Sequence, residues 1–149
     1  VPTKAIITLD QLVKSSEDRN IHTLSKIGTG DLVTYQDEQY LIINETVTKR
    51  HNKYKTIMRH CNHTVTIGRV SIPAVVSTEQ SFRLNESFSF VVDDTSITFT
   101  VQDTKENRDT LKKDLEFEFL HDYWKITNKN YTQKGIIVVT CDRTFEPTN

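Results

Sequence analysis

The sequence predicts an all-β protein made of two small barrel-like or sandwich-like β units with one short helix. About a dozen short runs rich in β-branched and aromatic residues alternate with polar turns, as antiparallel strands do. Only residues 104–113 have a helical composition. A pattern in the first half recurs in weaker form near the C-terminus, and such similarity indicates a duplicated unit. Closed barrels are favoured over open sheets because closure leaves no strand edge exposed.

The clearest elements form a three-stranded meander between Gly30 and Asn62. Runs at 32–35, 40–43 and 54–59 alternate in polarity and are separated by a polar turn and a basic tip. Glycine at the entry to the meander allows a positive φ there.

The remaining elements are shorter. We expect a strand at residues 5–9, a helical turn at 10–14 and a loop at 15–20. In the helix, Thr104 is the expected N-cap and Glu106 lies in the first turn. Further strands are expected at residues 64–67, 72–76, 87–92, 96–101, 115–119, 123–126 and 136–140.

The predicted duplication divides the chain into a first unit at 1–70, with an N-terminal extension, and a second unit at 71–149. The similarity aligns three pairs of segments: Asp31-Leu32 with Asp114-Leu115, Tyr40–Ile43 with Tyr123–Ile126, and Arg59–Asn62 with Val139–Asp142.

Composition limits the function. The net charge is −1, so bulk charge gives no reason to expect binding to nucleic acid or membrane. No apolar run approaches the roughly 20 residues that span a bilayer, and no signal-peptide pattern is visible. The chain begins at Val1 rather than at Met, as expected of a processed product, an excised piece or the ordered part of a longer protein. Cys61 and Cys141 are expected to be reduced thiols, with a disulfide as the alternative.

No motif points to catalysis, and no cofactor is expected. His60, Cys61 and His63 are metal-capable, but only Cys61 and His63 share a strand face, and two ligands do not make a structural zinc site. Glu116 and Glu118 are expected on the wet face of an amphipathic strand rather than as an acid–base pair. The sequence therefore predicts a protein that is not an enzyme.

One part of the sequence resembles a known family. The segments Gly30–Tyr35, Gln39–Ile43 and Lys53–Asn62 resemble virion structural proteins of tailed phages that infect low-GC Gram-positive bacteria. Similar features follow in the second half: Ile72-Pro73, the aromatic strand pair 88–101, the polar segment 107–110, Trp124-Lys125-Ile126 and Gly135-Ile136-Ile137. A difference is Lys113-Asp114-Leu115-Glu116, where that family has Gly-Asp-Arg-Phe.

The resemblance implies a non-enzymatic component of the head–tail neck, such as a head-completion, head-closure or connector protein. Such proteins form rings beneath the portal, so the implied partners are portal, connector or tail proteins and other copies of the chain. The implied location is the virion, assembled in the cytoplasm of the bacterial host. Two loops are the expected contact sites, with these residues: Thr48, Lys49, Arg50, His51, Asn52, Lys53, Asn130 and Lys134.

Two alternatives stay open. A small-barrel nucleic-acid-binding module would use a basic set around the tip: Lys49, Arg50, Lys53, Lys55 and Arg59. A passing contact of the virion protein with DNA would use the same tip. A secreted adhesin-like β domain would instead contain a Cys61–Cys141 disulfide.

Overall fold

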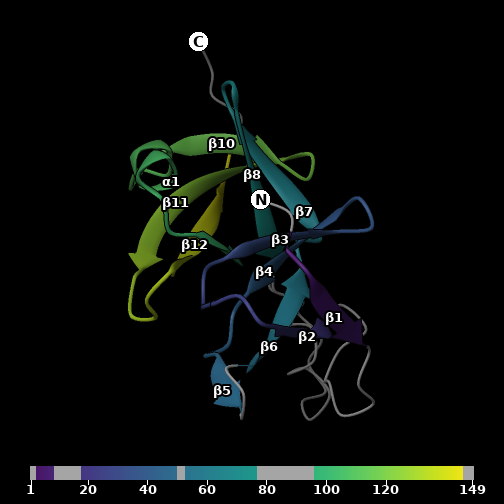
Figure 1. Ribbon diagram of the computed structural model, residues 1–149. Helices are drawn as coiled ribbons and strands as arrows, with labels where there is room; N and C mark the ends of the chain where they lie inside the picture. Colours follow the sequence, from purple (N-terminus) through teal and green to yellow (C-terminus); the bar gives the residue numbers. More distant parts are fainter. Residues whose placement is uncertain (1–2, 9–17, 50–52, 77–95, 146–149) are drawn as a thin grey trace, which may run out of the picture.

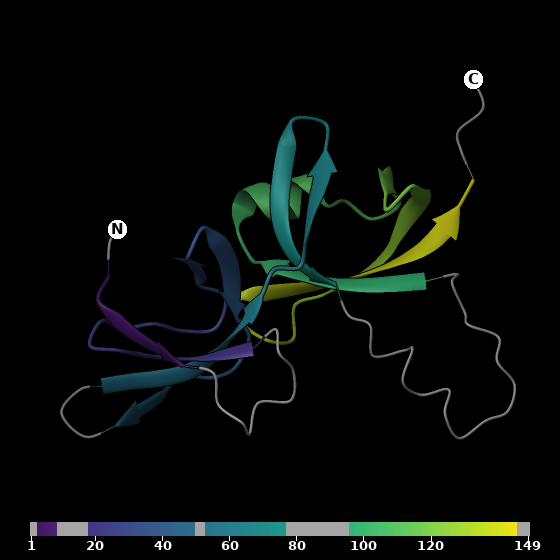
Figure 2. The same ribbon diagram turned by 90° about the vertical axis from the view of Figure 1, so that its right-hand side faces the viewer.

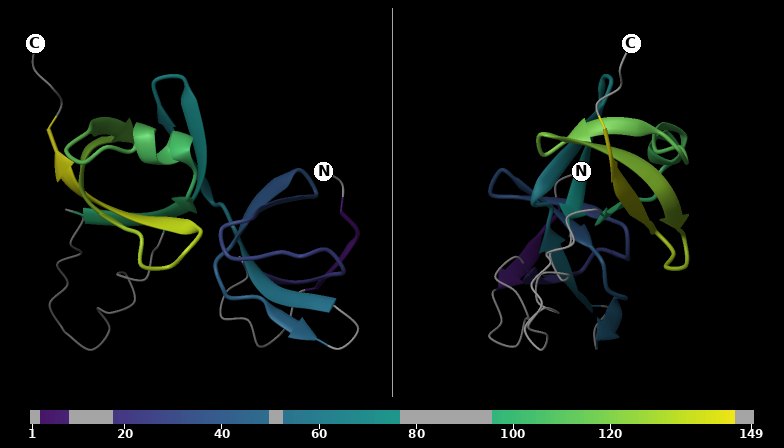
Figure 3. Two further views of the ribbon diagram at one scale, coloured as in Figure 1. Left: turned by 60° about the vertical axis from the view of Figure 1, so that its left-hand side comes forward. Right: turned by 180° about the vertical axis from the view of Figure 1, so that it is seen from behind.

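The structure is a computed structural model that describes residues 3–8, 18–49, 53–76 and 96–145. Within these ranges the chain forms twelve strands and one short helix. The strands build two curled antiparallel sheets that lie side by side (Figures 1 and 3). The predicted fold class is confirmed.

The first sheet has the strand order β1-β2-β6-β4-β3, and β5 also pairs with β6. Its small core contains Ile21, Tyr40, Ile42 and Met58, which project into the curl. The strands are β1 (Ala5–Thr8), β2 (Asp18–Thr23), β3 (Leu32–Tyr35), β4 (Glu38–Ile42), β5 (Val47–Lys49) and β6 (Lys53–His60).

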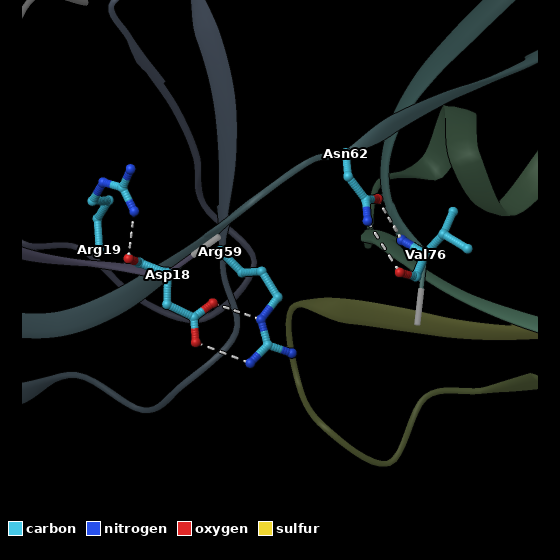
Figure 4. Close-up of polar contacts among 5 residues, drawn as sticks. All are labelled: Asp18, Arg19, Arg59, Asn62 and Val76. Atoms are coloured by element: carbon cyan, nitrogen blue, oxygen red, sulfur yellow. Dashed lines mark hydrogen bonds and ion pairs between the residues drawn. The ribbon is translucent and has the colours of Figure 1, made fainter. Parts of the chain in front are cut away.

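The expected loop at 15–20 is wrong for its described part, because residues 18–20 belong to β2. Asp18 is only 3% exposed, and its carboxylate accepts two hydrogen bonds from Arg59, of 2.7 and 3.0 Å (Figure 4). A bidentate pair of this kind allows a polar segment to pair with β6 in the interior of the sheet. The expected helical turn at 10–14 lies outside the described residues.

The second sheet has the strand order β10-β11-β12-β9-β8-β7 and a larger core centred on Phe99, Trp124 and Ile126. The helix α1 (Lys105–Thr110) connects β9 to the β10 region, and Thr104 caps it as expected by accepting from the Asn107 amide. The strands are β7 (His63–Ile67), β8 (Val70–Val76), β9 (Ser96–Gln102), β10 (Glu116–Phe119), β11 (Asp122–Asn130) and β12 (Ile136–Thr144).

Both sheets contain the same five-strand arrangement. In the first, the meander β3-β4-β6 is followed in space by β2 and then β1. In the second, the meander β10-β11-β12 is followed by β9 and then β8. In each sheet, the strand that comes before the meander in sequence lies beside the last strand of the meander. This arrangement is a Greek key. The chain is therefore a structural duplication, with β7 as an additional strand of the second unit.

The detailed alignment of the two units predicted from sequence is wrong by one residue for the first two pairs of segments and by three residues for the third. Both β3–β4 and β10–β11 are joined by two-residue turns with positive φ, at 36–37 and at 120–121. Superposing these turns places Leu32 at Glu116 and Met58 at Cys141. Cys61 therefore has no equivalence to Cys141. A shift of one residue matters because successive side chains in a strand point to opposite faces.

The change from one sheet to the other falls between His60 and His63. The predicted boundary between the two units lies at residue 70. In the structure, however, β7 pairs with β8 through a tight turn at Gly68, where φ is +62°. This hairpin keeps β7 with the second sheet.

Candidate functional site

The two units are held together by a small apolar interface. Leu41 of the first unit meets Val75 and Ile136 of the second, and these side chains are 0–7% exposed. Cys61, in the connection between the sheets, packs against the same cluster. The interface therefore joins residues far apart in sequence into one buried cluster.

Two glycine loops meet at this boundary with their backbones in direct contact. A Cβ atom added to Gly135 would lie 2.0 Å from the Thr29 carbonyl oxygen, and one added to Gly30 would lie 2.1 Å from the Gly135 carbonyl oxygen. Both glycines have a positive φ, of +95° and +96°. Only glycine fits such a close approach in this conformation.

The connection between the sheets is fixed by a side chain that acts like a strand partner. The Asn62 amide accepts from the Val76 N–H at 2.9 Å and donates to the Val76 carbonyl at 3.2 Å (Figure 4). This pair of bonds ties the connecting segment to the end of β8. The two units therefore contact each other directly through this bond pair, the glycine loops and the apolar cluster.

An open cleft of about 890 Å³ lies inside the curl of the first sheet. Its sides are β1 and β3, the two end strands of this sheet, and Ile7, Ile21, Ile27, Val33 and Tyr35 line it. Among the described strands, neither β1 nor β3 has a partner on its outer edge. Both edges therefore present backbone donors and acceptors beside a lining that mixes these apolar side chains with polar ones, among them Thr23, Ser25 and Thr34.

The second sheet is closed at the corresponding place. β7 bonds to β8, the counterpart of β1, and packs against β10, the counterpart of β3. Val65 of β7 is fully buried, and the His63 ring meets Phe119 edge-on with centroids 5.7 Å apart. β7 therefore occupies in the second unit the place that is a cleft in the first. Sequence reasoning missed this site, because it requires the strand order of both units.

Comparison with known families covers almost the whole chain. The family described as the YomX N-terminal domain matches residues 1–60, and the family described as the YomX C-terminal domain matches residues 59–142. This chain belongs to the YomX family. YomX is a phage-derived Bacillus gene product, so the chain is a phage-related protein. No significant match was found among curated proteins or solved structures. In the described part of this YomX-family chain, no helix is long and apolar enough to cross a membrane.

In this YomX-family chain the first predicted contact loop includes β5 and the start of β6, and these two paired strands extend away from the second unit (Figure 3). Thr48 and Lys49 lie on β5, and Lys53 begins β6 and pairs with Lys49. The eight residues of β6 put Lys53 roughly 25 Å from the connection between the units. Three of the predicted residues lie outside the described residues: Arg50, His51 and Asn52.

The second predicted contact loop lies elsewhere. Asn130 ends β11, and its side chain accepts from the Thr132 amide at 2.7 Å, while Lys134 is exposed in the following turn. Gln133 in this loop donates to the Ile43 carbonyl of the first unit. The two loops are counterparts in the duplication, but the fold does not bring them together. Their role as contact sites stays a prediction.

The residues of the nucleic-acid alternative are not equally available. Arg59 is paired with Asp18, and Lys55 is half-buried, whereas Lys53 is exposed. Arg59 thus has a structural role that its sequence context did not reveal. Of Lys53, Lys55 and Arg59, Lys53 alone is exposed, which is a small electrostatic footprint for phosphate binding.

The described cysteines are not joined in a disulfide. Burial raises the pKa of the Cys61 thiol to about 12, and burial together with the Asp142 carboxylate raises the pKa of Cys141 to about 12. Such thiols are protonated at neutral pH and react slowly. His60 contacts Glu38, and the His63 ring contacts Asn62 and Phe119. Among the described residues, no three metal-capable side chains are grouped.

Proposed function

We propose that this chain is a non-enzymatic structural protein of a phage particle at the head–tail neck, in a head-completion or connector ring. It acts through protein–protein contacts with portal, connector or tail proteins and with other copies of itself. Support comes from the phage origin of the family and from the buried cluster that joins the two units. Two joined units suit an assembly part, because each unit can contact a different partner.

The observation that carries the proposal is the open cleft between β1 and β3. Its occupant is one extended segment of a neighbouring virion protein with apolar residues at alternate positions. The second unit supports this occupant, because β7 supplies such a strand there from within the chain. Adding a strand to a free edge combines backbone hydrogen bonds with apolar side chains in the cleft.

The location is tested by electron microscopy of phage particles that carry a label on this chain. The expected result is label at the junction of head and tail. Label on the capsid shell or at the distal end of the tail, or its absence from purified particles, contradicts the proposal. The order of the neighbouring genes is an independent check, since a portal and capsid cluster is expected.

The cleft is tested by one substitution and a matched control. Val33→Asp places a charge in the cleft wall, whereas Gln39→Asp places the same charge on an exposed position of the neighbouring strand. In a phage that lacks the native protein, Val33→Asp is expected to leave heads and tails unjoined, and Gln39→Asp to restore infectious particles. Equal restoration by two folded variants rules out a role for the cleft.

A further inference from the structure

The duplication allows the contact between the two units to be repeated between two molecules. Within the chain, Val75 and Ile136 of the second unit dock on Leu32 and Leu41 of the first. The strand registers place Ile6 at the position of Val75 and Lys53 at that of Ile136. In the described part of the chain, no other unit covers this face of the first unit, and its Ile6 side chain is 67% exposed.

That face is exposed, partly apolar and basic. Ile6 and Leu24 are 67% and 69% exposed, an unusual state for two neighbouring large apolar side chains. A shallow groove runs between them and Lys53. We define the basic face by six residues on and beside β1, β2 and β6: Lys4, Ile6, His22, Leu24, Lys53 and Lys55.

Within the chain, Leu32 and Leu41 of the first unit form the surface on which the second unit docks. The corresponding surface of the second unit is acidic. The registers place Glu116 at the position of Leu32 and Lys125 at that of Leu41. Lys125 is 3.9 Å from Asp114, and the other carboxylates around it are exposed. We define the acidic face by five residues on and beside β10, β11 and β12: Asp114, Glu116, Glu118, Lys125 and Asp142.

We propose that the basic face of one copy of this chain binds the acidic face of the next copy. The arrangement repeats, between molecules, the docking of the second unit on the first. Three lysines on one face meet four carboxylates and one lysine on the other, so charge favours the contact and opposes basic–basic or acidic–acidic pairing. Ile6 and Leu24 supply the apolar part.

This contact joins two different faces, so each copy keeps one free face of each kind. Such head-to-tail contacts close into rings or continue as filaments. The inference deepens the proposed function and rests on it for the place of the ring in the particle. The contact itself is a property of the isolated chain, so it can be tested apart from that function.

The test is sedimentation velocity of the full chain from about 10 µM to about 1 mM, in low and in high salt. The expected result is weak association that grows beyond a dimer in low salt and is lost in high salt. Lys4→Glu with Lys53→Glu, and separately Glu116→Lys with Glu118→Lys, should each weaken association at least about tenfold. Mixing these two double variants, or combining all four changes, should restore it.

The control reverses charges outside both faces, with Lys105→Glu and Lys112→Glu, and should not change association. Trp124 fluorescence verifies the fold of the second unit, where this residue is buried, and far-ultraviolet circular dichroism verifies that both sheets of each variant are folded. The inference is overturned by absence of association at about 1 mM, by growth that stops at a dimer, or by mixtures that stay monomeric. Label at the neck without association in solution would leave the proposed function intact and remove only this inference.

Discussion

The contact between the glycine loops gives a direct test of the coupling between the two units. In Gly135→Ala, the new Cβ would lie 2.0 Å from the Thr29 carbonyl oxygen, and the residue would have to adopt a φ of +95°. The conformational part of the cost is roughly 1–2 kcal/mol. Relief of the steric overlap requires the loops to separate, so we expect a total loss of about 3 kcal/mol.

Two other glycines separate these contributions. Gly68 has a φ of +62° with no atom within 4 Å of an added Cβ, so Gly68→Ala measures the conformational cost alone, about 1 kcal/mol. Gly28 has neither a positive φ nor a close neighbour, so Gly28→Ala should change stability by less than about 0.5 kcal/mol.

The assay is equilibrium unfolding in urea followed by two signals. Trp124 is the single tryptophan and reports the second unit, whereas far-ultraviolet circular dichroism reports both sheets. The native chain should show coincident transitions, and Gly135→Ala should separate them, with the first unit unfolding at lower urea. The reasoning is refuted if Gly135→Ala is no less stable than Gly68→Ala and its two transitions still coincide.

Three further predictions concern other contacts. Asp18→Asn should reduce the free energy of unfolding by roughly 1–3 kcal/mol, because Arg59 loses its carboxylate partner; the loss is limited because Arg59 is partly exposed to water. Thermal unfolding measures the loss, with Asp37→Asn at an exposed position as the control. Asn62→Asp should cost a similar amount, because a carboxylate oxygen would face the Val76 carbonyl, whereas Asn62→Gln on a longer side chain should recover little of it. The thiols Cys61 and Cys141 should react with a disulfide reagent at pH 8 far more slowly in the folded than in the unfolded chain. Above pH 9.0 the unfolded thiols ionise while the folded ones, with pKa values of about 12, stay protonated, so stability should fall between these values. Fast reaction of both thiols in the folded chain would contradict the burial of these side chains.

Local patterns predicted much of the fold. The alternation in β3, β4 and β6 and the capping of α1 by Thr104 depend on neighbouring residues, and both predictions were confirmed. The strand β2 was missed in part because its sequence is polar, and only its partner Arg59, 41 residues away, explains the burial of Asp18. The register of the duplication was missed because the turns that define it have unrelated sequences, Gln36-Asp37 and Leu120-His121.

The candidate site was less predictable for the same reason. The cleft depends on which strands end up at the edges of the first sheet, and that requires the pairing of β2 with β6. The functional interpretation of the cleft depends on the comparison with β7. The predicted boundary at residue 70 put this strand in the first unit, whereas it belongs to the second sheet. The basic tip, in contrast, was visible in the sequence, but the structure places it and the second predicted contact loop at separate locations.

The position of the end strands gives the molecule an unequal resistance to force. Near the N-terminus, β1 is an edge strand with one neighbour, so tension there can peel it from β2 one hydrogen bond after another. Near the C-terminus, β12 lies between β11 and β9, and tension along it must shear two ladders at once (Figure 2). A chain pulled from both ends should therefore yield first at the N-terminal end, while the C-terminal end bears load.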